Sequence, residues 1–419
     1  MLERSDQQFV VSTFAGVGHR PMRLSPESNQ PADALYYLER GRAVIIGQLV
    51  DARSAEHRDE IDAPVRLEQE AAAQMPSRRR EALSELDACI HEIRGITGFE
   101  RFLLGQIAAE MQECASGGTI VVVNVVMLRS DAILVSADAI KTVNLPWLTA
   151  SDAEVWLGKK WRGPRSERAQ KNKEYLEYLS WLWEACVRQV LVAVGGGSDL
   201  ADGLPKIWWL GTGLVCSMPF YAAGTHADGS RENAFSRAIS SYTSSIRALG
   251  HVQHRARATE TAHGSLLIAT MPTTPSNGDM RDSRKPGLIL QSCEAGLAKQ
   301  DRLTVRRVSE LSLAGARLAY LSACSTAENK AARLADEVIH VVSGFQVAGF
   351  PHVVGCLWPS IDRVCVEVAR RFYSSLLGRR SQGWDDATVA SSLREAVMAV
   401  RATELGTPLT WAQFVHYGA

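Results

Sequence analysis

The sequence predicts an α/β protein: a mostly parallel sheet with helices on both faces, preceded by an α-helical region. Two observations predict this class. Apolar residues recur at helical spacing in residues 1–117, and from residue 118 onward apolar strand-like runs alternate with helical patterns. A chain of 419 residues is long enough for two or three domains. We therefore divide it into a helical region, residues 1–117, and an α/β domain, residues 118–419.

Two sets of leucines and isoleucines place an apolar face on helices of the N-terminal region. They are Leu35, Leu38, Ile45 and Leu49, and then Leu83, Leu86, Ile90 and Ile93. Residues 51–80 between them are charged and poor in large apolar groups, which is typical of an exposed helix or a linker. The basic run at 78–80 is interpreted as a solvated face. Gly117 and Gly118 mark the change to a strand pattern.

The first half of the α/β domain begins with three predicted strands over residues 119–128, 131–138 and 139–146. A long helix over 171–194 follows, then a strand over 206–213 and a helix over 231–248. The second half contains predicted strands at 264–272, 317–322 and 352–358, and a polar loop at 276–286. Helices are predicted over 333–348, 361–377 and 387–402, so strands and helices alternate as in a parallel sheet.

Composition excludes several classes of function. Lys plus Arg and Asp plus Glu both total 46, so the formal net charge is zero and nothing in it favours nucleic acid or an anionic membrane. No apolar run reaches the length that spans a bilayer, and the N-terminal residues lack the order of a secretory signal. The eight cysteines form no CxxC pair or zinc-like cluster, so we expect reduced thiols, in the cytosol or nucleus, and no metal or cofactor.

Three glycine-rich stretches could indicate a nucleotide-binding protein. The stretch at 194–198, VGGGS, lacks the Lys-Ser/Thr of a phosphate-binding loop and the spacing of a dinucleotide-binding turn. We interpret it as a helix end and loop. The stretches GTG at 211–213 and GVG at 16–18 are weaker signals, so nucleotide binding is the least favoured function.

The cysteine at position 324 follows the predicted strand over 317–322 and precedes a helical pattern. In α/β folds this position suits a nucleophile, because a nearby helix N-terminus lowers the pKa of the thiol. The alternative is a buried structural cysteine, which is common. Cys356 lies in an apolar run and is interpreted as core packing. The remaining cysteines are assigned structural roles.

A catalytic thiol also needs a histidine at the end of a neighbouring strand to transfer the proton. His263-Gly264 precedes Cys324 by about sixty residues, but the apolar run comes after it, which places His263 at the wrong end of its strand. His251 and His254 lie in a polar segment and are interpreted as solvated. His340 lies on the helix after Cys324 and His352 at the start of the next strand, so neither occupies a strand's carboxyl end.

Five segments resemble fungal CHAT-domain proteins, which are related to caspases and separases and often follow tetratricopeptide-type helical repeats. The segments are ARLAYLSACSTA, LADEVIHVVSGFQVAGFPHVVGCLWPS, SSYTSSIRAL, LLIATMPTTP and the ending WAQFVHYGA. The resemblance covers roughly residues 118–419 and extends more weakly to helices around 34–50 and 81–105. It implies a caspase-like fold and a cysteine peptidase in which Cys324 is the cysteine of the SAC motif. The helical region would then be a remnant of a repeat array.

The sequence departs from the family at one place. The resemblance implies a second apolar stretch ending in a histidine motif before the cysteine strand. Here Pro275 is followed by SNGDMRDSRKPGLILQSCEAG, and a strand, a helix and the histidine strand are missing between Pro275 and Gly287. No residue inherits the histidine role. A faulty or truncated gene model and a protein that has lost catalysis both explain the gap.

Two functions follow from these observations. The first is a caspase- or separase-type cysteine peptidase with Cys324 as nucleophile, inactive in this chain because the base is missing. The second is a non-catalytic scaffold that binds protein partners. Either function implies a protein or peptide as substrate or partner, without nucleic acid or membrane.

Overall fold

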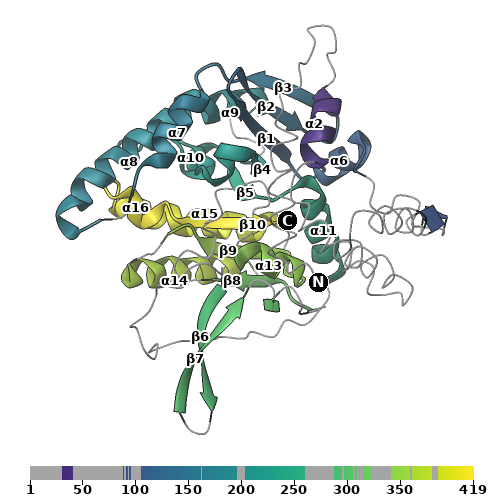
Figure 1. Cartoon of the computed structure of the whole chain (residues 1–419). Coiled ribbons are helices and arrows are strands. Elements are labelled where there is room, and N and C mark those ends of the chain that lie inside the picture. The colour runs from purple at the N-terminus through teal and green to yellow at the C-terminus, as the bar shows by residue number, and fades with distance from the viewer. Residues whose placement is uncertain are drawn as a thin grey trace, which may run out of the picture.

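The computed structural model describes residues 31–40, 105–161, 163–195, 203–259, 287–294, 297–304, 315–321, 341–358, 361–379 and 386–419, and positions 88, 91, 92, 94, 95, 307, 308, 311 and 313. Within them, one eight-stranded sheet has the order β3-β2-β1-β4-β5-β10-β9-β8 (Figure 1). Its strands are β1 (Thr119–Val126), β2 (Arg129–Val135), β3 (Ile140–Asn144), β4 (Lys206–Gly211), β5 (Ile239–Tyr242), β8 (Leu318–Tyr320), β9 (His352–Cys356) and β10 (Phe414–Gly418).

Helices cover the sheet on both faces. They are α2 (Pro31–Arg40), α6 (Ala108–Cys114), α7 (Ala150–Gly158), α8 (Arg168–Leu182), α9 (Arg188–Val194), α10 (Ala234–Arg237), α11 (Ile246–Thr259), α13 (Val341–Val347), α14 (Asp362–Gly378), α15 (Asp386–Thr403) and α16 (Pro408–Trp411). Short helical turns lie at Arg165–Glu167, Trp183–Val187, Gly213–Ser217 and Phe220–Ala222.

The strand β1 shows why both faces must be covered. Its side chains point alternately to opposite faces of the sheet. Val121 and Val123 belong to a large apolar cluster with residues of α8, α14 and α15, whereas Ile120 and Val122 belong to a second cluster with residues of α2, α6 and α11. Because both faces are buried, the strand is a continuous Val/Ile run, as the sequence predicts.

Four of the seven pairings in the sheet are parallel: β1 with β4, β4 with β5, β5 with β10, and β8 with β9. Three are antiparallel: β1 with β2, β2 with β3, and β9 with β10. The predicted α/β class with a mostly parallel sheet is therefore confirmed. The three strands predicted over 119–146 are confirmed as β1, β2 and β3, and each pairs antiparallel with the next.

The sheet has two parts whose strands point in opposite directions. β10 is parallel to β5 but antiparallel to β9, and β9 is parallel to β8. The carboxyl ends of β4 and β5 therefore lie at one edge of the sheet, and those of β8 and β9 lie at the opposite edge. We call the junction of β5 with β10 the seam. Its backbone pairing is limited to Tyr417 with Tyr242, so side chains supply most of the contacts described below.

The predicted helix over 231–248 is wrong in its middle. The structure has the short helix α10, then the strand β5, and only at Ile246 does the long helix α11 begin. The strand sequence, ISSY, lacks the apolar run that reveals β1 and β4. Its serines remain in the centre of the sheet because they form hydrogen bonds: Trp209 Nε1 donates to Ser240 Oγ over 3.1 Å, and Ser241 Oγ lies 2.8 Å from His416 Nδ1.

Other sequence predictions correspond closely to described elements. The helix over 171–194 is α8, a π-helical turn and α9, and it ends at Gly195 with a left-handed φ of 92°. The helices over 361–377 and 387–402 are α14 and α15. The strands β6 (Gly287–Glu294) and β7 (Leu297–Thr304) pair with each other in a separate antiparallel two-stranded sheet. The predicted strand over 264–272, the loop over 276–286 and most of residues 1–117 lie outside the described residues.

Candidate functional site

The carboxyl ends of β8 and β9 lie at the edge of the sheet that precedes Cys324 in the sequence. Leu321 continues the pairing beyond β8, since its backbone N–H donates to Val354 O over 2.8 Å. Cys356 ends β9, is 1% exposed, and has its Sγ 4.0 Å from Leu321 O. Cys324 itself lies outside the described residues, three positions after Leu321. Cys356 is thus a packing residue, as the sequence predicts.

Aromatic side chains surround this edge. The ring of Tyr320 lies 5.3 Å from that of Phe372 and 5.6 Å from that of Tyr373, both on α14. Burial raises the pKa of the Tyr320 hydroxyl. Trp358, just beyond β9, donates from Nε1 to Leu409 O over 2.9 Å. The described part of this edge is therefore mostly apolar.

The two described histidines of the C-terminal part belong to a buried chain of hydrogen bonds. His416 Nδ1 lies 2.8 Å from Ser241 Oγ, and His416 Nε2 lies 3.2 Å from His352 Nδ1. Burial, then the neighbouring His352 and Lys206, lower the pKa of His416 well below its ordinary value. The neutral ring therefore connects β5, β10 and β9 across the seam. The serine, the two histidines and this role are not predictable from sequence spacing.

His352 is the first residue of β9, as predicted, and Cys356 is the last. Four residue steps of a strand span about 13 Å. β8 is parallel to β9, and its first residue, Leu318, pairs with His352. The carboxyl end of β8 therefore lies at the opposite edge of the sheet from His352. The structure thus confirms that His352 does not lie at a strand's carboxyl end.

His226 lies between α10 and the turn before it, and both its ring nitrogens are engaged. Its Nε2 lies 2.8 Å from Ala222 O, and Arg401 donates from Nε to its Nδ1 over 2.9 Å. The ring packs edge-on against Trp411, with centroids 4.8 Å apart. Burial and the Arg401 charge lower the pKa of His226 to about 4. The neutral imidazole positions the guanidinium and is not free to accept a proton.

The environments predicted for the other histidines are confirmed in one case and wrong in another. His254 is exposed on α11, as expected. His251 is only partly exposed, and burial, then Arg255 and His254, lower its pKa to about 4, so the prediction that it is solvated is wrong. It faces inward from the amphipathic helix. His263 and His340 lie outside the described residues, as does Cys324.

Five cysteines are described as free thiols: Cys114, Cys186, Cys216, Cys356 and Cys365. Burial raises the pKa of Cys114 to about 11 and that of Cys186 further, as expected for structural thiols. In the described ranges, no three His, Cys, Asp or Glu side chains are grouped as a metal site. None of the described helices is long and apolar enough to cross a membrane.

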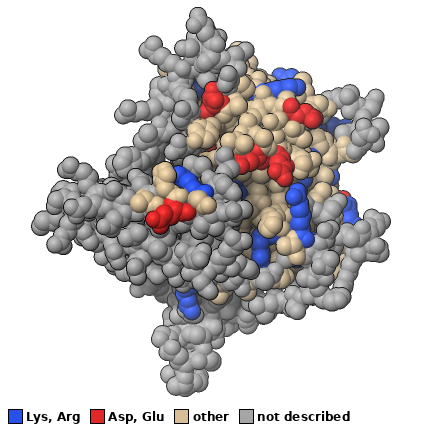
Figure 2. Space-filling model, turned by 90° about the vertical axis from the view of Figure 1, so that its right-hand side faces the viewer, with Lys and Arg blue, Asp and Glu red and all other residues tan. Residues whose placement is uncertain are grey.

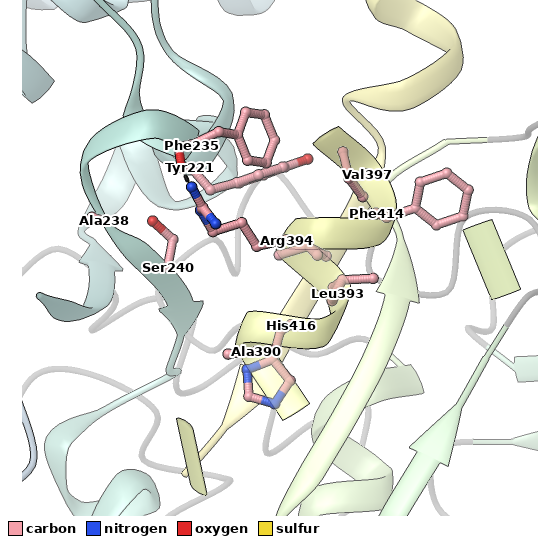
Figure 3. Close-up of a pocket in the computed structure, with 11 residues that line it drawn as sticks. Tyr221, Phe235, Ala238, Ser240, Ala390, Leu393, Arg394, Val397, Phe414 and His416 are labelled. Atoms are coloured by element: carbon pink, nitrogen blue, oxygen red, sulfur yellow. Dashed lines mark hydrogen bonds between the residues drawn. The ribbon is translucent and has the colours of Figure 1, made fainter. Parts of the chain in front are cut away.

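A pocket opens at the seam, between α15 and the segment that carries α10 and β5 (Figure 3). It is a small depression that is partly open to solvent. Its walls are Tyr221, Phe235, Ala238, Ser240, Ala390, Leu393, Arg394, Val397, Phe414, Val415 and His416. Arg394 donates from Nε to Phe235 O, so the guanidinium connects the two sides of the pocket. No sequence motif indicates this pocket, because its walls come from segments about 150 residues apart.

Charge on the outer surface is mixed. Figure 2 shows basic and acidic side chains side by side on the described part of one face. This agrees with the formal net charge of zero. The buried charges are different: the described residues that are buried include Lys206 and Arg401 but no Asp or Glu.

Comparison with known proteins finds a family similarity in the C-terminal part of the chain. Residues 261–419 match the family model of the CHAT domain. No curated protein matches the chain. Two crystal structures of the separase–securin complex of Saccharomyces cerevisiae are similar, with 11% and 10% identity and TM-scores of 0.45 and 0.44. Each match covers 99% of this chain and 40% of the yeast chain, so the chain spans less than half of that length. Residues 261–419 are thus similar to a CHAT domain, as the motifs around Cys324 predict.

Proposed function

We propose that this chain is a caspase-like CHAT protein that binds a protein or peptide partner and does not cleave it. Under this proposal, residues 118–419 form the CHAT domain. Residues 1–117 are the remnant of a helical repeat array, like the arrays that often precede the domain in fungal CHAT proteins. The solved separase structures contain securin, a protein partner of separase, which supports a protein as the ligand class. The free thiols in the described residues favour the cytosol or nucleus.

The position of the described histidines carries the proposal. Cys324 follows the carboxyl end of β8, whereas His352 starts the parallel strand β9 and bonds to His416. The sequence between Pro275 and Gly287 lacks the histidine motif that the CHAT resemblance implies. A thiol without a positioned base loses the proton transfer that amide cleavage requires.

The alternative is a cysteine peptidase with Cys324 as nucleophile. The match of residues 261–419 to the CHAT domain and the place of Cys324 after a strand of the sheet favour it. Backbone N–H groups near the strand end would then stabilise the oxyanion. This function needs a base from residues outside the described ranges, where the histidines of the chain are His19, His57, His263 and His340.

The reactivity of Cys324 separates the two functions. We expect iodoacetamide to alkylate it with the pH dependence of an ordinary thiol, because the proposed binding function gives Cys324 no activating base. Mass spectrometry across pH 5–9 would measure the rate at each cysteine, with partly exposed Cys216 and Cys365 as ordinary thiols and Cys186 as a buried reference. A Cys324→Ala chain should retain the co-purifying proteins of the wild type.

Two results together would overturn the proposed binding function and support the cysteine peptidase instead. They are selective alkylation of Cys324 below pH 7 and cleavage of a peptide library that the Cys324→Ala chain does not perform. Equal labelling of Cys324, Cys216 and Cys365, with no cleavage by either chain, would support the binding function.

A further inference from the structure

The seam pocket contains one charged group without a carboxylate partner. Arg394 lies on α15, is partly buried, and has Phe235 O as its acceptor among the described residues. Burial lowers the pKa of its guanidinium, and the neighbouring Glu395 offsets this in part. That carboxylate is already engaged, by Ser375 and Arg379. A half-desolvated cation facing a pocket is stabilised by an anion placed within hydrogen-bond reach.

The other polar groups of the pocket show what a ligand would find. Tyr221 donates its hydroxyl proton to Ala412 O over 2.7 Å, and His416 is engaged on both nitrogens. Ser240 Oγ accepts from Trp209 Nε1, which leaves its own hydroxyl proton for donation into the pocket. Figure 3 shows Arg394 reaching from α15 toward the segment that carries Phe235 and Ser240. Arg394 and Ser240 thus present donors, and no acidic side chain is found among the described residues that line the pocket.

Two further side chains buried near the pocket also carry a positive charge. Arg401 lies seven residues further along α15, is 7% exposed, and has a buried Nη2 without a hydrogen-bond partner in the described structure. Lys206, also 7% exposed, lies on β4 beside the seam and donates from Nζ to Ala419 O. Both of these buried side chains are cations, although the formal net charge of the whole chain is zero.

We propose that the seam pocket binds the carboxylate of a Glu or Asp side chain from an acidic segment of a protein partner. Arg394 and the Ser240 hydroxyl donate to the carboxylate oxygens, and Phe235, Leu393 and Val397 contact the aliphatic part of the side chain. The pocket is a small depression, partly open to solvent, so it suits the end of one side chain rather than a cofactor. The inference rests on the proposed binding function and specifies the chemistry of the partner.

Fluorescence polarisation with the full chain tests it. The probe is a fluorescein-labelled peptide, Gly-Ser-Glu-Glu-Ser-Gly, compared with a twin that carries Gln in place of Glu, at low ionic strength. We expect the Glu peptide to bind at least ten-fold more tightly than the Gln peptide. Arg394→Gln should remove this preference, and Arg394→Lys should keep part of it because the charge remains.

Arg370→Gln is the matched control. It makes the same change of charge on α14, where Arg370 is exposed and pairs with Glu367 over 2.7 Å. Unchanged affinity in Arg370→Gln beside the loss in Arg394→Gln would support the pocket. An equal loss in both variants would show diffuse attraction and overturn the inference. Circular dichroism identifies a variant that does not fold, and in that case the Arg394→Lys result and the comparison of the two peptides decide.

Other outcomes are also decisive. If inorganic phosphate displaces the peptide at concentrations where acetate does not, the site prefers phosphate and the carboxylate assignment is wrong. If neither peptide binds at millimolar concentration, the pocket inference falls. The proposed function would survive that result if Arg394→Gln still retained the proteins that co-purify with the wild type. It would fall if Cys324 proved to be a catalytic thiol.

Discussion

Replacement of Trp411 by alanine is expected to lower the free energy of unfolding by about 4 kcal/mol, in the range for a large buried aromatic. Trp411 is 0% exposed and precedes β10 on α16. Its ring packs against His226 and Phe235, with Arg401 over its face, and Nε1 donates to Glu404 O over 2.9 Å. Truncation would leave a cavity where α15, α16 and the α10 segment meet.

The measurement is equilibrium unfolding in urea, monitored by far-UV circular dichroism because that signal reports the backbone rather than tryptophan. Trp147→Ala is the control, because the same side chain is removed from a position that is 73% exposed. Its expected effect is within about 0.5 kcal/mol. A loss below about 1 kcal/mol for Trp411→Ala would contradict the packing described for this side chain.

Acidification below pH 6.5 is expected to destabilise the fold steeply, because buried histidines resist protonation. The pKa of His226 is lowered to about 4 by burial and by Arg401, and that of His416 is lowered well below its ordinary value by burial and His352. In the unfolded chain both return to about 6.5. Below that pH the unfolded state binds protons that the native state does not, so unfolding becomes more favourable as pH falls.

Each of these histidines contributes about 1.4 kcal/mol of destabilisation per pH unit between its unfolded and folded pKa. For His226 the loss begins near pH 6.5 and is complete below about pH 4. Urea unfolding at several pH values from 7.5 to 5 measures the slope. His226→Gln should reduce the slope by the contribution of one histidine, whereas His254→Gln, at an exposed position of α11, is the control. An identical slope in the wild type and in His226→Gln would contradict the assignment.

The candidate site divides into a part that the sequence reveals and a part that it does not. The motif around Cys324 is one continuous segment, and so is the stretch after Pro275 that lacks the histidine motif implied by the resemblance. Both features can therefore be found in the sequence without a structure. The match of residues 261–419 to the CHAT domain agrees with that motif. Arg394, Ser240 and the histidine pair have no such signal, because each residue acts with partners on other elements. The role of Cys324 stays a prediction.

By itself the sequence determined the fold class, the strands β1, β4, β8 and β9, and the long helices α8, α14 and α15. These elements have apolar runs or helical periodicity that burial requires, so local pattern is sufficient. Only the tertiary structure decided that ISSY is a strand, since serines can occupy the centre of a sheet once Trp209 and His416 are there to bond them. It alone decided that β10 joins β5, which creates the seam and places Arg394 opposite Phe235. Hydrogen bonds between residues 31 and 175 positions apart leave no local pattern, and their geometry exists only after the chain has folded.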